Sequence, residues 1–151
     1  ICTALVRAGA AVINDEDSVT ASHRPLRAFE FDATHCPDLF PALAALAAAA
    51  QGESVIRGTS RLEHKECNRA DAIREEYAKA GIEVDTSQED VMRIRGGRIR
   101  AARVQSHGDH RMAMSMAVAG LLSDGEMTIE DAECVAKSYP GFFEDLEKIR
   151  I

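Results

Sequence analysis

The sequence predicts an α/β fold that contains about two copies of one β-α-β-α-β-β unit. Strand-like and helix-like segments alternate along the chain, which is typical of α/β domains. The helix-to-strand junction Gln-Gly-Glu-Ser-Val-Ile at 51–56 is matched by Asp-Gly-Glu-Met-Thr-Ile at 124–129. A lysine also occurs at a similar distance after the glycine of each junction, Lys65 in the first and Lys137 in the second. Long internal periods indicate repeated supersecondary units. A coincidence between two ordinary helix–glycine–strand junctions would give the same pattern.

The first unit begins with a strand, a helix and a second strand. Residues 26–32 carry phenylalanines at alternate positions, which places both rings on one face of a strand. A proline at its start and a glycine just beyond its end favour a helix over 37–50. Residues 54–57 are then predicted to form a short strand.

The first unit continues with a second helix over 63–80, which Gly81 ends. Three further strands are predicted over 82–85, 91–95 and 98–104. The dipeptide Gly96-Gly97 between the last two strands indicates a tight β-hairpin. The first unit is therefore expected to span residues 26–104.

The second unit repeats the beginning of the first and is shorter. Its predicted segments are a strand at 103–106, a loop at 107–109, a helix at 110–122, a strand around 127–129 and helical turns at 132–137 and 141–149. We expect this unit to span residues 103–151. Residues 1–25 add little to this pattern.

The composition predicts one folded cytoplasmic domain. The chain has 151 residues, of which 46% are hydrophobic and 28% charged, and four widely spaced cysteines, a pattern typical of reduced thiols. Its net charge of −7 argues against a nucleic-acid partner, and it contains no apolar run long enough to span a membrane. The chain starts at Ile1, without an initiator methionine and inside an apolar pattern, so we expect it to be a fragment.

Charged side chains recur in the loops that follow the predicted strands. They are Asp32, Lys65, Glu66, Arg69, Asp109, His110, Arg111 and Lys137. On a helix over 63–80, Lys65 and Arg69 would be i,i+4 neighbours, with Glu66 on an adjoining strip. Local cations in an acidic protein favour a pocket for a multiply anionic small molecule, and the carboxylates add acid–base capacity. Ordinary surface ion pairs would give the same pattern.

Four sequence motifs, in this order, resemble those of the EPSP synthase (3-phosphoshikimate 1-carboxyvinyltransferase) family. They are Asp32-x-x-x-x-Pro37-Asp38, Lys65-Glu66-x-x-Arg69, Asp109-His110-Arg111-Met-Ala-Met and Ala136-Lys137-Ser-Tyr-Pro-x-Phe-Phe. The resemblance covers the chain from about Leu26 onward. It implies the two-domain, inside-out α/β fold of enolpyruvyl transferases, with this chain as part of one domain from the C-terminal third of a monomeric enzyme whose N-terminal part is missing.

The resemblance also implies a role for each matching residue. Asp32 and Glu66 would be catalytic, Asp32 as a base on the shikimate hydroxyl and Glu66 as the acid/base group for the enol methylene. Lys65 would bind shikimate 3-phosphate. Phosphoenolpyruvate would be bound by Arg69, Arg111 and Lys137, with His110 as a lesser contact. No metal or other cofactor is implied.

The chain departs from the family pattern at Cys67-Asn68, where Ser or Thr followed by Asp is usual, and we expect the loss of that Asp to remove a brace for the neighbouring arginine or lysine. Three alternatives remain open. One is an enzyme like UDP-N-acetylglucosamine enolpyruvyl transferase, which lacks the Lys-Glu-x-x-Arg motif. Another is a zinc site formed by His35, Cys36, His64 and Cys67. The third is a non-catalytic α/β interaction module.

Overall fold

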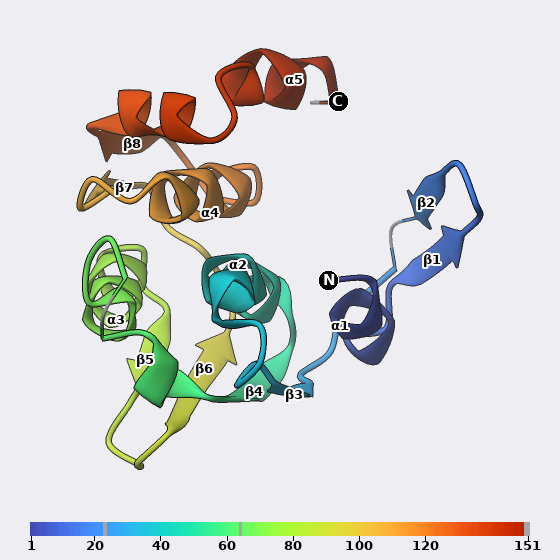
Figure 1. Ribbon diagram of the computed structural model, residues 1–151, viewed down its shortest axis with the longest axis horizontal. Helices are drawn as coiled ribbons and strands as arrows, with labels where there is room; N and C mark the ends of the chain where they lie inside the picture. The colour runs from blue at the N-terminus through green and yellow to red at the C-terminus, as the bar shows by residue number, and fades with distance from the viewer. Residues whose placement is uncertain (23, 64, 150–151) are drawn as a thin grey trace.

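The structure, a computed structural model, describes residues 1–22, 24–63 and 65–149. The chain begins with helix α1 (Cys2–Arg7) and an antiparallel hairpin of β1 (Ala11–Asn14) and β2 (Val19–Ser22). All of β2 is exposed, and the hairpin extends away from the rest of the molecule (Figure 1). The hairpin therefore adds nothing to the core.

The first sheet has four strands in the order β3-β4-β6-β5. These strands are β3 (Glu30–Asp32), β4 (Gly52–Arg57), β5 (Glu83–Asp85) and β6 (Val91–Gly96). The helical segments between them are η1 (Pro37–Leu39), α2 (Phe40–Ala49), η2 (Thr59–Arg61) and α3 (Arg69–Lys79). Strands β3 and β4 are parallel, whereas β6 is antiparallel to both of its neighbours. The sheet thus combines a parallel crossover with antiparallel pairing.

The second sheet repeats the parallel crossover. It consists of β7 (Ala102–Gln105) and β8 (Met127–Glu130), which are parallel and are connected through α4 (His110–Gly120). The chain continues through η3 (Ala132–Lys137) and ends with α5 (Phe142–Ile149). The predicted α/β fold class is confirmed, while the unit limits of 26–104 and 103–151 stay a prediction.

Helices α2 and α4 lie between the two sheets, whereas no residue of α5 is buried. Helix α2 packs against β4 and β6 on one side and against α4 on the other, and α4 packs in turn against β8 (Figure 1). Eight of the ten residues of α2 are buried. A helix that is apolar all round suits such an interior position, and its alanines allow close approach of its neighbours. No helix in the described part of the chain is both long and apolar enough to cross a bilayer.

The hairpin predicted at Gly96-Gly97 is wrong, because β6 pairs with β4 and β5, and β7 pairs with β8. The two glycines instead lie under the C-terminal end of α2. A Cβ at Gly96 would lie 1.9 Å from the carbonyl oxygen of Ala50, and the Gly97 N–H donates to Ala48 O at 3.1 Å. The glycines therefore allow β6 to meet the end of this helix, and the predicted strand 98–104 begins only at β7.

Two other predicted boundaries also change. Helix α3 begins at Arg69, because the Asn68 side chain caps it by accepting from the Asp71 N–H at 3.4 Å. Lys65 and Glu66 consequently lie in the preceding loop, so the expected i,i+4 relation between Lys65 and Arg69 is wrong. The strand predicted over 26–32 is regular only in β3, although an isolated bridge continues the pairing at Arg27.

Candidate active site

The candidate site is centred on Arg69, whose side chain is completely buried and contacts three carboxylates. Its Nε donates to Asp109 Oδ2 at 2.6 Å, and its Nη1 donates to Asp38 Oδ1 at 2.7 Å. Its Nη2 donates to Glu66 Oε2 at 2.6 Å. We refer to Arg69 with Asp38, Glu66 and Asp109 as the Arg69 cluster. Charge-assisted hydrogen bonds of this length are strong and directional, so each carboxylate has a fixed place.

Three members of the Arg69 cluster each lie at the start of a different helical segment. Asp38 lies in η1, and Arg69 is the first residue of α3. Asp109 is the N-cap of α4, accepts from the Arg111 N–H at 2.8 Å and has no exposed surface. Because helix N-termini favour nearby negative charge, the Asp109 carboxylate is stabilised by α4 as well as by Arg69.

Two further cations face the exposed side of Asp38. Lys65 Nζ lies 3.2 Å from Asp38 Oδ1, and Arg111 Nη2 lies 3.5 Å from Asp38 Oδ2. The hydrogen bond from Arg69, followed by the interactions with Lys65 and Arg111, lowers the pKa of Asp38 below its usual range. The site therefore presents three cations around one partly exposed carboxylate, an arrangement that can bind an anion.

His110 and Cys67 flank the Arg69 cluster. His110 is only 8% exposed; its Nδ1 is buried, has no hydrogen-bond partner among the described residues and lies 4.0 Å from Glu66 Oε1. The thiol of Cys67 lies 3.8 Å from Asp109 Oδ2. Burial, followed by the charge of Asp109, raises the pKa of Cys67 to about 11, so this thiol is neutral at physiological pH. Cys67 is therefore a weak hydrogen-bond donor to Asp109.

Asn68, the other departure from the family pattern, retains a capping function. Its Oδ1 accepts from the Asp71 N–H, and its Nδ2 donates to Asp71 Oδ2 at 2.6 Å. The cations beside it are held by Asp38, Glu66 and Asp109. The absence of an aspartate at this position therefore leaves the Arg69 cluster intact.

Lys137 lies beside the loop that leads into α4. Its Nζ donates to the carbonyl oxygen of Gly108 at 3.0 Å. His107, which precedes Gly108 in this loop, has a positive φ of 54°. Its Nε2 lies 2.7 Å from Glu76 Oε1, within hydrogen-bond distance. Lys137 thus contacts the loop that carries Asp109 without itself joining the Arg69 cluster.

Asp32 lies apart from the other predicted site residues. It ends β3, is exposed, and accepts from the Thr34 N–H at 3.0 Å. Hydrogen bonds from the side chain and backbone of Thr34 lower the pKa of Asp32, which is therefore ionised at neutral pH. Within residues 1–22, 24–63 and 65–149, no hydrogen bond or ion pair joins Asp32 to the Arg69 cluster.

The zinc alternative receives no support from the geometry. His64 lies outside the described residues. Among those described, the groups with metal-ligand spacing are Glu66–Asp109–His110 and Glu75–Glu76–His107, which include neither Cys36 nor Cys67. In the first group Arg69 already donates to both carboxylates, so a metal ion would meet the charge of the guanidinium.

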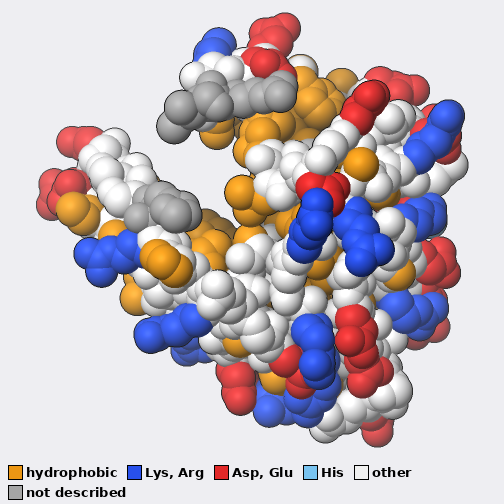
Figure 2. Space-filling model, turned by 180° about the vertical axis from the view of Figure 1, so that it is seen from behind, with side chains coloured by type: hydrophobic (Ala, Val, Ile, Leu, Met, Phe, Trp, Pro, Cys, Tyr) orange, Lys and Arg blue, Asp and Glu red, His pale blue; other side chains and the backbone are white. Residues whose placement is uncertain are grey.

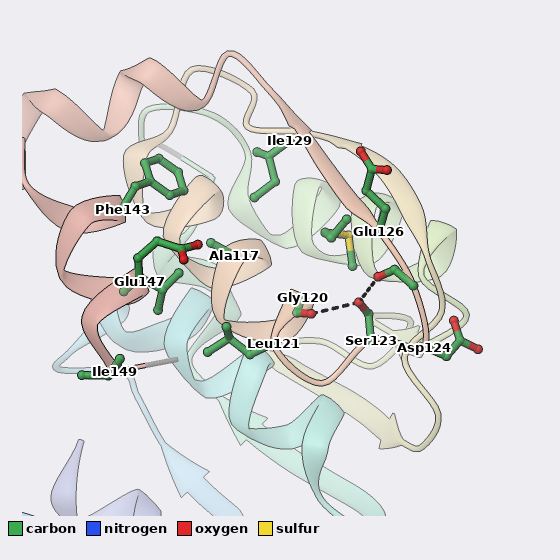
Figure 3. Close-up of a pocket in the computed structure, with 13 residues that line it drawn as sticks. Ala117, Gly120, Leu121, Ser123, Asp124, Glu126, Ile129, Phe143, Glu147 and Ile149 are labelled. Carbon is green, nitrogen blue, oxygen red and sulfur yellow. Dashed lines mark hydrogen bonds between the residues drawn. The ribbon is translucent and has the colours of Figure 1, made fainter. Parts of the chain in front are cut away.

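Two open pockets lie away from the centre of the Arg69 cluster. One of about 980 Å³ lies between α4, β8 and α5, where Ser123 donates to the carbonyl oxygens of Gly120 and Gly125 (Figure 3). The described residues that line it include none of the predicted site residues. The other, of about 440 Å³, is mainly apolar and reaches Asp38 and Arg111 at one end. Figure 2 shows a hollow with hydrophobic side chains along its floor.

Asp38 had no predicted role, and Asp109 was predicted only as one of the carboxylates of the pocket, although both occur in the motifs. A signal for Asp109 was available, since an aspartate directly before an apolar helix is a typical N-cap. For Asp38 the local sequence indicates only a helix start after Pro37. Its partner Arg69 lies 31 positions away. The contact between them is therefore evident only in the folded chain.

Comparison with solved structures assigns the fold. An EPSP synthase from Acinetobacter baumannii has a similar structure, with a TM-score of 0.82 and a sequence identity of 31%. The match covers 97% of this chain and 38% of the Acinetobacter chain. The enolpyruvyl transferase NikO from Streptomyces tendae matches 98% of this chain, and 34% of its own chain is covered, with a TM-score of 0.74 and 27% identity. The helices packed between sheets, with a cationic site at helix starts, thus define an enolpyruvyl transferase fold.

Sequence comparison identifies the family. The family model described as EPSP synthase (3-phosphoshikimate 1-carboxyvinyltransferase) matches residues 1–146, and the chain belongs to this family. A relative of that name from Methanocella arvoryzae is 43% identical over 96% of this chain, and one from Thermococcus kodakarensis is 42% identical over 97%. The match begins at residue 1, so the N-terminal residues are more informative than expected. The chain spans about a third of these relatives, 35% and 36%.

Proposed function

We propose that this chain is the C-terminal part of a 3-phosphoshikimate 1-carboxyvinyltransferase. The enzyme would transfer the enolpyruvyl group of phosphoenolpyruvate to the 5-hydroxyl of shikimate 3-phosphate and release phosphate. The observation that carries the proposal is the Arg69 cluster with Lys65 and Arg111 on its exposed side. Both substrates are multiply anionic, and fixed cations suit their phosphate and carboxylate groups.

The cations divide between the two substrates in this proposal. Lys65, which is partly exposed, binds the phosphate of shikimate 3-phosphate. Arg111 and Lys137 bind phosphoenolpyruvate, with His110 as a lesser contact. Arg69 also binds phosphoenolpyruvate, but all of its nitrogens donate to carboxylates in this structure. Because the guanidinium is also completely buried, direct contact with the substrate requires a carboxylate to move aside.

The two catalytic carboxylates perform different proton transfers. Attack of a hydroxyl on C2 of an enol phosphate needs a proton at C3 and removal of the hydroxyl proton. Asp32 is ionised and exposed, which suits it to accept the hydroxyl proton. Glu66 is fixed by Arg69 and lies beside His110, which suits it to exchange a proton with the methylene carbon.

Loss of phosphate from the tetrahedral intermediate concentrates negative charge on the leaving group. Arg111 and Lys137 stabilise that charge because they are already oriented by Asp38 and by the Gly108 carbonyl oxygen. In this proposal the stabilisation comes from these side chains, and no metal or organic cofactor takes part.

The remaining parts of the proposal concern the whole protein. The chain spans about a third of its relatives, so further site residues would come from an N-terminal part of the same enzyme. We propose a cytoplasmic monomer whose partners are its two small substrates. The net charge of −7 supports the absence of a nucleic-acid partner.

The test is phosphate release from phosphoenolpyruvate and shikimate 3-phosphate by the chain completed to the length of its relatives. Glu66→Gln and Asp32→Asn should each lower kcat by about 10²–10⁴-fold, the range for loss of a general acid or base. Glu83→Gln, at an exposed ion pair on β5, is the matched control and should retain the rate.

Other outcomes point to the alternatives. Activity with UDP-N-acetylglucosamine in place of shikimate 3-phosphate would indicate the related transferase. A folded full-length protein that neither releases phosphate nor binds shikimate 3-phosphate would support the interaction module and contradict the proposed function.

A further inference from the structure

Asp38 contacts three of the proposed substrate-binding cations, but in the proposed reaction it neither transfers a proton nor binds a substrate. Its Oδ1 accepts from Arg69 Nη1 at 2.7 Å and lies 3.2 Å from Lys65 Nζ. Its Oδ2 lies 3.5 Å from Arg111 Nη2. Both carboxylate oxygens are therefore occupied by groups that would otherwise bind phosphate or carboxylate oxygens of a ligand.

Asp38 also differs from Asp109 in its exposure. The Asp38 side chain is 49% exposed, whereas that of Asp109 is fully buried. Moving Asp109 would leave a buried charge without its partner, which is strongly unfavourable. Asp38 can turn into water, and Arg69 would still be held by Asp109 and Glu66.

We propose that Asp38 is the counter-ion of the anion site, a positioning residue that holds Lys65, Arg69 and Arg111 and releases them to the anionic substrate. This inference rests on the proposed function only in naming the substrate. The exchange of Asp38 for a bound anion applies to any phosphate group that reaches these cations.

The exchange has two opposite effects. Without a ligand, the Asp38 carboxylate offsets repulsion among three neighbouring cations and keeps them in one arrangement. When an anion arrives, the same carboxylate competes with it, which weakens ground-state binding. Removing the charge should therefore tighten anion binding while it slows the reaction, because the cations are no longer oriented.

The experiment uses the full-length protein and two measurements. The first is calorimetric titration with inorganic phosphate at low salt, which does not depend on catalysis. The second is the KM for phosphoenolpyruvate and the kcat of phosphate release. Asp38→Asn should lower both the phosphate Kd and the KM by about two- to fivefold, the size expected of a partly exposed ion pair. It should also lower kcat by about tenfold or more.

Two variants serve as controls. Asp38→Glu keeps the charge and should remain within about twofold of the wild-type phosphate Kd. Glu83→Gln removes a carboxylate charge from an exposed ion pair on β5 and should change neither constant. If Asp38→Asn does not fold, Asp38→Glu still tests the proposal, because phosphate binding tightened in that variant would contradict it.

The outcomes separate this inference from the proposed function. Tighter phosphate binding by Asp38→Asn in a protein without transferase activity would support the counter-ion role and reject the proposed reaction. An unchanged or weaker phosphate affinity, or a KM that rises as kcat falls, would show that Asp38 only supports the local structure and would overturn the inference.

Discussion

At the scale of single residues, Arg69 determines whether the site exists. One guanidinium neutralises Asp109, which has no exposed surface, and orients Asp38 and Glu66 at the edge of the site. Removing one partner of a buried ion pair is far more harmful than replacing the whole pair, because it leaves a desolvated charge uncompensated. The stability of the fold and the geometry of the site therefore depend on the same side chain.

Arg69→Met should lower the free energy of unfolding by about 3–5 kcal/mol, as expected for a buried charge left without its partner. Urea unfolding of the full-length protein measures the change. The matched control is Arg95→Met, since Arg95 is exposed and pairs with Glu53 at 3.2 Å and Glu83 at 3.5 Å. That control should cost less than about 1 kcal/mol. Equal losses in the two variants would refute this account of Arg69.

At the scale of elements, the junction after β6 depends on a glycine that touches the end of α2. A Cβ at Gly96 would lie 1.9 Å from Ala50 O and 2.3 Å from Ala47 O, distances that no side chain tolerates. A Cβ at Gly97, the next residue, would have no neighbouring atom of the described residues within 4 Å. The two neighbouring glycines therefore differ in what their missing side chains permit.

Gly96→Ala should lower the free energy of unfolding by about 2 kcal/mol or more, because the helix end must move. Gly97→Ala should leave it unchanged or raise it by up to about 1 kcal/mol, through reduced freedom of the unfolded chain. Denaturant unfolding of both variants provides the comparison. A tolerated Gly96→Ala would mean that α2 does not pack against β6 as described.

Helix α3 is joined to the loop before α4 by the buried carboxylate of Glu76. This side chain is 1% exposed and accepts from Lys79 Nζ at 2.7 Å and from the Gln105 N–H at 2.9 Å, with His107 Nε2 at 2.7 Å. Burial by itself would raise the pKa of Glu76, but the hydrogen bonds from Lys79, Gln105 and His107 lower it overall.

Glu76→Gln should lower the free energy of unfolding by about 2 kcal/mol at pH 7, since charged hydrogen bonds are lost in a buried place. A lowered pKa stabilises the fold above the usual glutamate value of 4.5, and this contribution is lost as the pH falls through the folded-state pKa. The difference from wild type, measured by urea unfolding at several pH values, should therefore shrink below pH 4.5.

Glu75→Gln is the matched control, because Glu75 is the exposed neighbour on the same helix. It should change the free energy of unfolding by less than about 0.5 kcal/mol at any pH. A Glu76→Gln difference that stays constant between about pH 7 and pH 3.5 would exclude the ionised carboxylate as its cause.

At the scale of the whole molecule, the sequence was sufficient for the α/β class and for most helices, because alternating apolar patterns and proline and glycine signals are local. The sequence was insufficient where contacts between segments that are far apart along the chain decide where an element begins or ends. Gly96-Gly97 has the local pattern of a hairpin, but the end of α2 occupies the space above it. The start of α3 is set by Asn68, although residues before it are compatible with a helix.

The site was predictable to a similar extent. The motifs named the residues, and the structure brings Lys65, Glu66, Arg69, His110 and Arg111 together. The sequence could not show that Asp38 contacts three cations, since that depends on segments that are far apart along the chain. The roles given to all of these residues stay predictions, and Asp32 and Lys137 in addition lie outside the Arg69 cluster.

The partners of Arg69 have a consequence for how the protein folds and fluctuates. Asp38 and Asp109 lie 31 and 40 positions from Arg69, so their contacts close long loops and are expected late on a folding pathway. A bound anion would then slow amide hydrogen exchange at the starts of α3 and α4 together, whereas η1, whose Asp38 the anion displaces, would not share this protection. Occupancy of the site would thus be followed as protection of two distant stretches of backbone.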